Sequence, residues 1–375
     1  MFLKKTGPFL VLFVALSALA PALFAQTPTP APVVDDTPET IYTEEIKLNV
    51  SAFDTYGDFV SEVKADDLVI LEDGRIHQAS SIRRLPASIL IVLDTGGEMR
   101  NVKSLQQTRE TAMSLVASLS GEDSVALLEY NDKPKILLEW TTDKDQTLSV
   151  LKKDLNFGRR SVFVDALNLA TEFLRKSENE NRHLVLITDG TDSFDRADRR
   201  TEEMRRLMTT NINVHVISYT LLEAAKVEPK TKSTGAKPHP NPLPDEVIAG
   251  LPNGVRETAR ATKILTINTD KEFLRVMKKR KQDLDESSDF LLALSENTSG
   301  MYILPQTKDE MTEKAKLIGK IIDSNYVVTY TPKRPLSESP DGEIRNVEVS
   351  SRRAGLRVSA KRKLLIDNTP DQTTN

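Results

Sequence analysis

The chain has 375 residues, no cysteine, and 51 basic against 55 acidic residues, a formal net charge of −4. This length suits one large domain with additions, or two domains. The lack of cysteine excludes disulfides and thiol chemistry. The near balance of charge gives no excess of positive charge that would indicate nucleic-acid binding. The four histidines are scattered along the chain, which argues against a zinc site.

The amino terminus has the pattern of a secretory signal peptide over residues 1–25. Lys4 and Lys5 precede an apolar run at residues 9–19, and the segment ends at Ala25 in the sequence Ala-Leu-Phe-Ala. The apolar run is shorter than the about 20 residues that span a bilayer, which favours cleavage over a retained anchor. The sequence therefore predicts an exported protein, periplasmic or secreted, with no stable membrane span after cleavage.

Two segments with alternating apolar and polar residues flank the main domain. Residues 26–40, rich in proline, threonine and aspartate, are expected to be a disordered spacer. Residues 41–86 and residues 324–366 then show strand-like alternation with Asp-Gly turns. We expect a small antiparallel β unit at each end, paired with one another, and a disordered polar tail at residues 367–375.

Residues 87–323 alternate between strand and helix patterns. The unbroken apolar run at residues 89–93 suits a strand buried on both faces of a parallel sheet, and similar runs follow at residues 183–189 and 213–219. This alternation predicts an α/β fold with a doubly wound, mostly parallel, Rossmann-like sheet. Residues 222–263, rich in lysine, proline and glycine, are expected to form a flexible insertion.

Three motifs in this order resemble a von Willebrand factor A-type domain. They are Asp94-Thr-Gly-Gly-Glu-Met, Ser161-Val-Phe-Val-Asp-Ala-Leu, and Leu-Val-Leu-Ile-Thr-Asp189-Gly. Leu71-Glu-Asp-Gly before the domain and Tyr326-Val-Val-Thr-Tyr-Thr-Pro after it resemble the exported acidobacterial variety of such proteins. The resemblance implies a non-enzymatic module for adhesion or assembly that binds an unidentified protein partner.

The resemblance also implies a metal-ion-dependent adhesion site in altered form. In the family, this site takes an aspartate and two serines from one loop, a threonine from a second loop and an aspartate from a third. Asp94, Ser161 and Asp189 occupy the positions of the first aspartate, the threonine and the last aspartate, whereas Gly96 and Glu98 replace the two serines. The candidate ligands for Mg²⁺ or Mn²⁺ are therefore Asp94, Glu98, Ser161 and Asp189.

Carboxylates that converge on one site need a counter-charge, which either a divalent cation or an arginine can supply. Arg100, Arg159 and Arg160 lie next to the loops in question. Gly96, Arg159 and Arg160 are also expected to belong to the edge on which the partner docks. The choice between metal and guanidinium, and the oligomeric state, stay open from the sequence.

Two other classes of function are open. Leu-Asp94-Thr-Gly resembles the catalytic loop of an aspartic protease, a hydrolase in which two aspartates share a proton, although the next acidic loop is Thr188-Asp-Gly within an α/β pattern. A structural envelope protein also fits the export signal. Nucleotide binding has no support, because no glycine-rich phosphate-binding motif occurs.

Overall fold

The computed structural model describes residues 44–97, 105–194, 196–238 and 263–367, together with Val247, Gly250, Pro252 and Arg256. The chain divides into two compact units, Met1–Tyr42 and Thr43–Asn375, and the described residues all belong to the second. The predicted signal peptide, the spacer and most of the tail therefore lie outside the described residues.

A mixed six-stranded sheet forms the centre of the main domain, in the order β12-β9-β8-β5-β6-β7. The strand β7 pairs antiparallel with β6, and the other neighbours pair in parallel. The six strands are β5 (Ser88–Asp94), β6 (Ser124–Tyr130), β7 (Pro134–Thr141), β8 (Arg182–Thr188), β9 (Asn213–Ser218) and β12 (Tyr302–Ile303).

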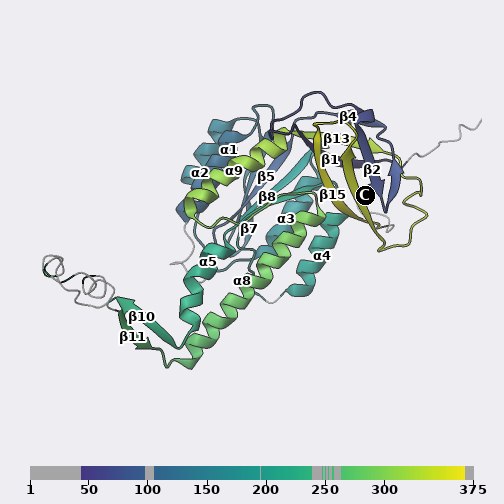
Figure 1. The fold of residues 1–375 in the computed structure, drawn as a ribbon. Helices are drawn as coiled ribbons and strands as arrows, with labels where there is room; N and C mark the ends of the chain where they lie inside the picture. The colour runs from purple at the N-terminus through teal and green to yellow at the C-terminus, as the bar shows by residue number, and fades with distance from the viewer. Residues whose placement is uncertain are drawn as a thin grey trace, which may run out of the picture. The chain divides into compact units, whose positions relative to one another are not determined.

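Helices cover both faces of this sheet (Figure 1), which explains the unbroken apolar run of β5. Ile89 and Ile91 belong to one core with α1, α2 and α9, whereas Leu90 and Val92 belong to a second core with α3, α4 and α8. These helices are α1 (Leu105–Ser118), α2 (Lys144–Lys153), α3 (Phe163–Arg175), α4 (Ala197–Met208), α8 (Lys271–Asn297) and α9 (Lys308–Asp323).

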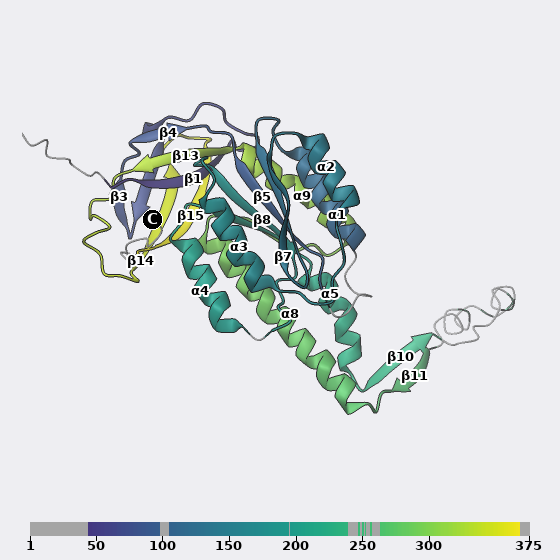
Figure 2. The same cartoon turned by 180° about the vertical axis from the view of Figure 1, so that it is seen from behind.

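The segment predicted to be a flexible insertion, residues 222–263, is partly regular in its described residues. The helix α5 (Thr220–Val227) follows β9 and lies along the first half of α8 in both views (Figures 1 and 2), where Val227 packs on Met277 and Leu284. A 3-10 helix η2 (Glu228–Thr231) and a hairpin of β10 (Thr234–Pro238) and β11 (Lys263–Ile267) complete the connection. The prediction was wrong for these parts because the lysine-rich and proline-rich composition hid a short apolar face.

The terminal segments build one seven-stranded antiparallel sheet, in the order β3-β2-β14-β15-β1-β13-β4 (Figure 2). Their pairing with one another is confirmed, because β1 pairs with β13 and β15, and β14 pairs with β2. The expectation that the additions are small was wrong, because the paired segments build a seven-stranded sheet with a core of its own. The strands are β1 (Ile46–Phe53), β2 (Leu68–Glu72), β3 (Arg75–His77), β4 (Ser81–Arg83), β13 (Asn325–Tyr330), β14 (Ile344–Ser351) and β15 (Arg357–Leu365), and η1 (Ala65–Asp67) precedes β2.

Among the described residues, no helix has the length and apolar character required to cross a membrane.

Candidate functional site

Asp94 and Asp189 lie at the same edge of the six-stranded sheet. Asp94 ends β5, and Asp189 follows directly after β8, its parallel neighbour. The carboxyl ends of neighbouring parallel strands lie at the same edge of a sheet, and open α/β sheets bind their ligands at this edge. Ser161, just before α3, joins them by donating a hydrogen bond from its Oγ to Asp94 Oδ1 over 3.3 Å.

The carboxylate of Asp94 is buried and accepts hydrogen bonds on both oxygens. Gly96 N donates to Oδ1 over 3.1 Å, and Thr188 Oγ1 donates to Oδ2 over 3.2 Å. Since Thr188 gives its one hydroxyl proton to Asp94, the Tyr130 hydroxyl donates to Thr188 over 2.6 Å. Burial, together with the charges of Asp94 and Asp189, raises the pKa of Tyr130 well above its ordinary value, so this phenol stays protonated.

The carboxylate of Asp189 is fully buried and paired with a guanidinium. Its Oδ1 accepts from the backbone N and the Oγ1 of Thr191, over 2.9 and 2.7 Å, and its Oδ2 lies 2.8 Å from Nη2 of Arg280. The same Nη2 lies 2.6 Å from Oε2 of Glu223 on α5. Burial opposes the charge of Arg280, but the two carboxylates outweigh it and raise the pKa of the guanidinium above its ordinary value.

Arg280 comes from α8, 91 residues after Asp189 along the chain, and was not among the arginines considered from the sequence. Arg160 instead holds its guanidinium over the Phe194 ring, 5.4 Å from the centroid, and the backbone N–H groups of Arg159 and Arg160 donate to Asp132. Arg100 lies outside the described residues. A sequence signal for Arg280 exists, because it shares the helical face of the buried Met277 and Leu284.

Position 96 has no room for a side chain. A Cβ on Gly96 would lie 1.9 Å from the carbonyl oxygen of Arg160 and 2.9 Å from Cα of Asn131. The first serine of the family motif is therefore excluded by the close approach of the loop that carries Arg160. Glu98, at the second serine position, lies outside the described residues.

The described oxygen donors do not fit a resident Mg²⁺ or Mn²⁺ ion. Both oxygens of Asp94 and of Asp189 already accept hydrogen bonds, and a divalent cation beside Asp189 would be repelled by the guanidinium of Arg280. Among the described residues, no group of three or more histidine, cysteine, aspartate or glutamate side chains has metal-binding geometry.

The arrangement does not favour an aspartic-protease dyad either. Such a dyad requires two carboxylates that share a proton. Here the hydroxyl of Thr188 contacts Asp94, and Asp189 forms an ion pair with Arg280.

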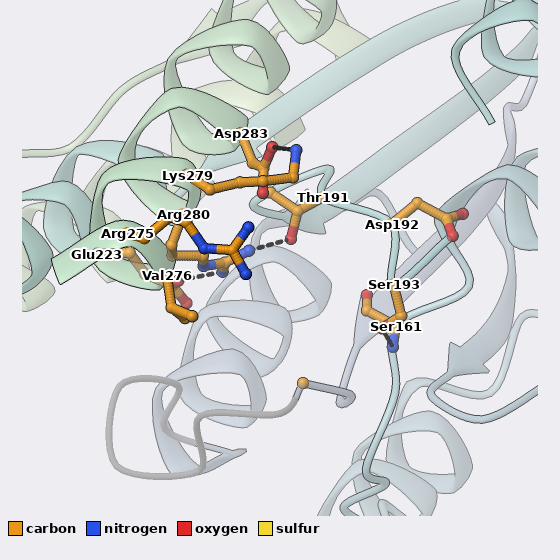
Figure 3. Close-up of a pocket in the computed structure, with 11 residues that line it drawn as sticks. Ser161, Thr191, Asp192, Ser193, Glu223, Arg275, Val276, Lys279, Arg280 and Asp283 are labelled. Atoms are coloured by element: carbon orange, nitrogen blue, oxygen red, sulfur yellow. Dashed lines mark hydrogen bonds and ion pairs between the residues drawn. The ribbon is translucent and has the colours of Figure 1, made fainter. Parts of the chain in front are cut away.

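A pocket of about 330 Å³ opens beside this edge (Figure 3). On one side, Thr191 and Ser193 contribute hydroxyl groups from the loop after β8, and Ser161 contributes one from the loop before α3. On the other side, Arg275, Val276 and Lys279 line the pocket from α8, next to Arg280. The pocket thus combines polar loops with a cationic helix face, above an ion-paired carboxylate.

Comparisons with known proteins agree with the sequence motifs. Residues 89–191 match the family of the von Willebrand factor type A domain. This segment, which includes β5 and β8 with Asp94 and Asp189, is therefore similar to a von Willebrand factor type A domain. No curated protein sequence matches it.

Several solved structures are similar to the chain at low identity. An aerotolerance-related membrane protein from Bacteroides fragilis is 17% identical over 63% of this chain and 98% of that one, with a TM-score of 0.37. BatB from Bacteroides thetaiotaomicron gives the same identity and coverage with a TM-score of 0.36. A von Willebrand factor type A protein from Catenulispora acidiphila is 9% identical over 88% of this chain and 75% of that one, with a TM-score of 0.39.

Proposed function

We propose that the protein is a non-catalytic module that binds a protein partner at the edge formed by Asp94, Ser161 and Asp189, together with the adjoining pocket. The family match supports a role in protein–protein interaction. The observation that carries the proposal is the ion pair of Asp189 with Arg280 next to a concave pocket. A binding surface of this kind is preformed, because the buried charges already have partners.

In this proposal, Arg280 takes the role that a divalent cation has in the family. The guanidinium of Arg280 forms ion pairs with both Asp189 and Glu223, and its Nη1 orients Thr191 through a 2.8 Å hydrogen bond. The site is thus a degenerate adhesion site that works without a resident Mg²⁺ or Mn²⁺. The partner then contacts hydroxyl groups and cationic side chains rather than completing a metal's coordination.

The proposal also includes the export and the domain organisation that the sequence predicts. The signal-peptide pattern at residues 1–25 supports export to the periplasm or the medium. Residues 87–323 form the binding module, and the terminal β segments at residues 41–86 and 324–366 form its scaffold.

Site-specific photo-crosslinking tests the docking surface. The photoreactive residue p-benzoylphenylalanine is introduced at Val276, which lines the pocket and is 47% exposed, or at Leu317 on α9, which is 44% exposed and outside the pocket. In the producing cells we expect a discrete crosslinked protein from position 276 that is missing from position 317. The same products from both positions, or none from position 276, would reject this surface.

Calorimetric titration with Mg²⁺ and Mn²⁺ tests the role of Arg280. We expect no binding heat and no thermal stabilisation of the protein by either ion. Stabilisation that disappears in Asp94→Ala would instead establish a metal site.

A further inference from the structure

The described residues around α5 and the first half of α8 differ in charge from the rest of the chain. Residues 220–234 and 267–284 contain nine basic and five acidic residues, a formal charge of +4, although the whole chain carries −4. The other residues therefore carry −8 together. A local excess of this size in an acidic chain creates a field that selects and orients an oppositely charged partner.

Four of these cations form one stripe on α8. Lys271, Arg275, Lys278 and Lys279 follow the spacing that brings side chains onto one helical face, and all four are exposed. The opposite face holds Met277, which is buried against α5. The packing of α8 therefore does not require the stripe, which we call the α8 cationic stripe.

The ion pairs within α8 bind these cations only weakly. Arg275 Nη2 lies 2.7 Å from Glu272 and Lys279 Nζ lies 3.0 Å from Asp283, but the side chains of Arg275 and Lys279 are 77% and 76% exposed. Exposed pairs contribute little to stability, and a lysine four residues before its acid has the less favourable orientation. Carboxylates of a partner can therefore replace Glu272 and Asp283 at small cost.

The stripe is continuous with the pocket, because Arg275 and Lys279 belong to both (Figure 3). Within the pocket, Arg275, Lys279 and Arg280 are balanced by three acidic residues, Asp192, Glu223 and Asp283. The excess of positive charge thus begins on the exposed face of α8 and not inside the pocket.

We propose that the α8 cationic stripe binds an acidic segment of the protein partner, whose carboxylates lie along Lys271, Arg275, Lys278 and Lys279 while a neighbouring residue enters the pocket. This inference rests on the proposed function, since it names the chemistry of the partner at the same edge. A protein segment fits better than an anionic bilayer, because the pocket is concave and the negative charge of the other residues opposes a flat anionic surface.

The test uses a short, fluorescently labelled glutamate homopeptide and the purified protein. The variant Lys271→Glu/Arg275→Glu/Lys278→Glu is compared with Arg357→Glu/Lys361→Glu/Lys363→Glu, which makes the same charge change on exposed residues of β15. We expect the peptide to bind the stripe variant at least about tenfold more weakly than wild type and the control variant almost normally. Added salt should weaken binding to the wild type, because exposed charges are screened.

An equal loss of affinity in the two variants would show that the peptide responds only to the overall charge of the protein. This result would overturn the inference. Binding to phosphatidylglycerol vesicles without binding to the peptide would assign the stripe to a lipid surface and also overturn it. The crosslink from Val276 separates this inference from the proposed function. If the stripe variant keeps that crosslink at full yield, the docking edge stands and the acidic partner is rejected.

Discussion

At the residue scale, the charge of Arg280 on an otherwise buried helix face is tolerated because two carboxylates and a hydroxyl surround it. Removing one member of a buried ion pair leaves the other without a counter-charge, and this is more costly than replacing all members together. The contacts of Arg280 with Asp189 and Glu223 should therefore be among the most sensitive of the site.

Replacing this side chain in Arg280→Met should lower the free energy of unfolding by about 3 kcal/mol, because Asp189 stays buried without its cation. Urea denaturation measures the change. The matched control is Arg275→Met on the same helix, where the side chain is 77% exposed and no measurable loss is expected. Similar midpoints for the two variants would show that the buried pair does not stabilise the domain.

A serine at position 96 brings the sequence closer to the family motif, yet we expect Gly96→Ser to lower the free energy of unfolding by about 1–3 kcal/mol, because its Cβ overlaps the carbonyl of Arg160. Thermal unfolding with and without Mg²⁺ should show this loss and no rescue by the ion. Gly121→Ser is the control, since a Cβ there meets nothing within 4 Å. A Gly96→Ser protein as stable as wild type would contradict the close approach.

At the element scale, a directed chain of hydrogen bonds joins β8 and β9. Met301 N donates to His215 Nδ1 over 3.2 Å, so His215 carries its proton on Nε2 and donates to His183 Nδ1 over 3.0 Å. His183 Nε2 lies 2.8 Å from Asn181 Oδ1 and 3.2 Å from Asn325 Nδ2. Each imidazole is neutral and fully buried, and an added proton on either would face another donor.

This chain predicts acid sensitivity. Burial lowers the pKa of His215 to about 4, and burial with the neighbouring His215 lowers the pKa of His183 well below its ordinary value. In the unfolded chain both histidines titrate near about 6.5, so the unfolded state binds more protons below that pH. The free energy of unfolding should therefore have its highest value above about pH 6.5 and should decrease as the pH drops towards 4.

Chemical denaturation between pH 7.5 and about 5 measures this effect, because most carboxylates do not yet titrate in that window. The variant His183→Gln/His215→Gln should show a clearly flatter dependence than wild type. An unchanged slope in the variant would mean that other groups cause the acid sensitivity.

At the scale of the whole second unit, polar contacts of a buried arginine and of a partly exposed serine join the two large sheets. Arg362 of β15 is fully buried, and its guanidinium donates to the carbonyl oxygens of Leu207 and Ile212, each over 3.4 Å. Ser299 Oγ, after α8, donates to the carbonyl of Lys361 over 2.9 Å. Separating the sheets would leave these groups without their partners, so we expect them to unfold as one cooperative unit.

Two fluorescence reporters test this cooperativity. Trp140, stacked on Phe173 with centroids 5.1 Å apart, reports the six-stranded sheet, and Trp140→Phe/Phe59→Trp moves the reporter next to Tyr326 in the seven-stranded sheet. The denaturation midpoint of each protein by fluorescence should coincide with its midpoint by circular dichroism. An early fluorescence transition for the reporter at position 59 would show that the terminal sheet unfolds by itself.

The sequence alone determined the elements that depend on local periodicity. The apolar run at residues 89–93 predicted a strand covered on both faces, and the order of strands and helices predicted a largely parallel sheet. This sheet also predicted that Asp94 and Asp189 lie at the same edge, because Asp94 ends one strand and Asp189 directly follows a parallel strand. The pairing of the terminal segments also followed from their alternation.

Only the tertiary structure decided how the charges of that edge are satisfied. Arg280 meets Asp189 across 91 residues because α8 packs beside β8 and β9, and no local pattern encodes which distant side chain fills a buried contact. The same holds for Gly96, whose missing side chain matters only because the loop of Arg160 passes within contact distance. Periodicity reports which faces are buried, whereas the partner of a buried charge is decided by the packing of the complete chain.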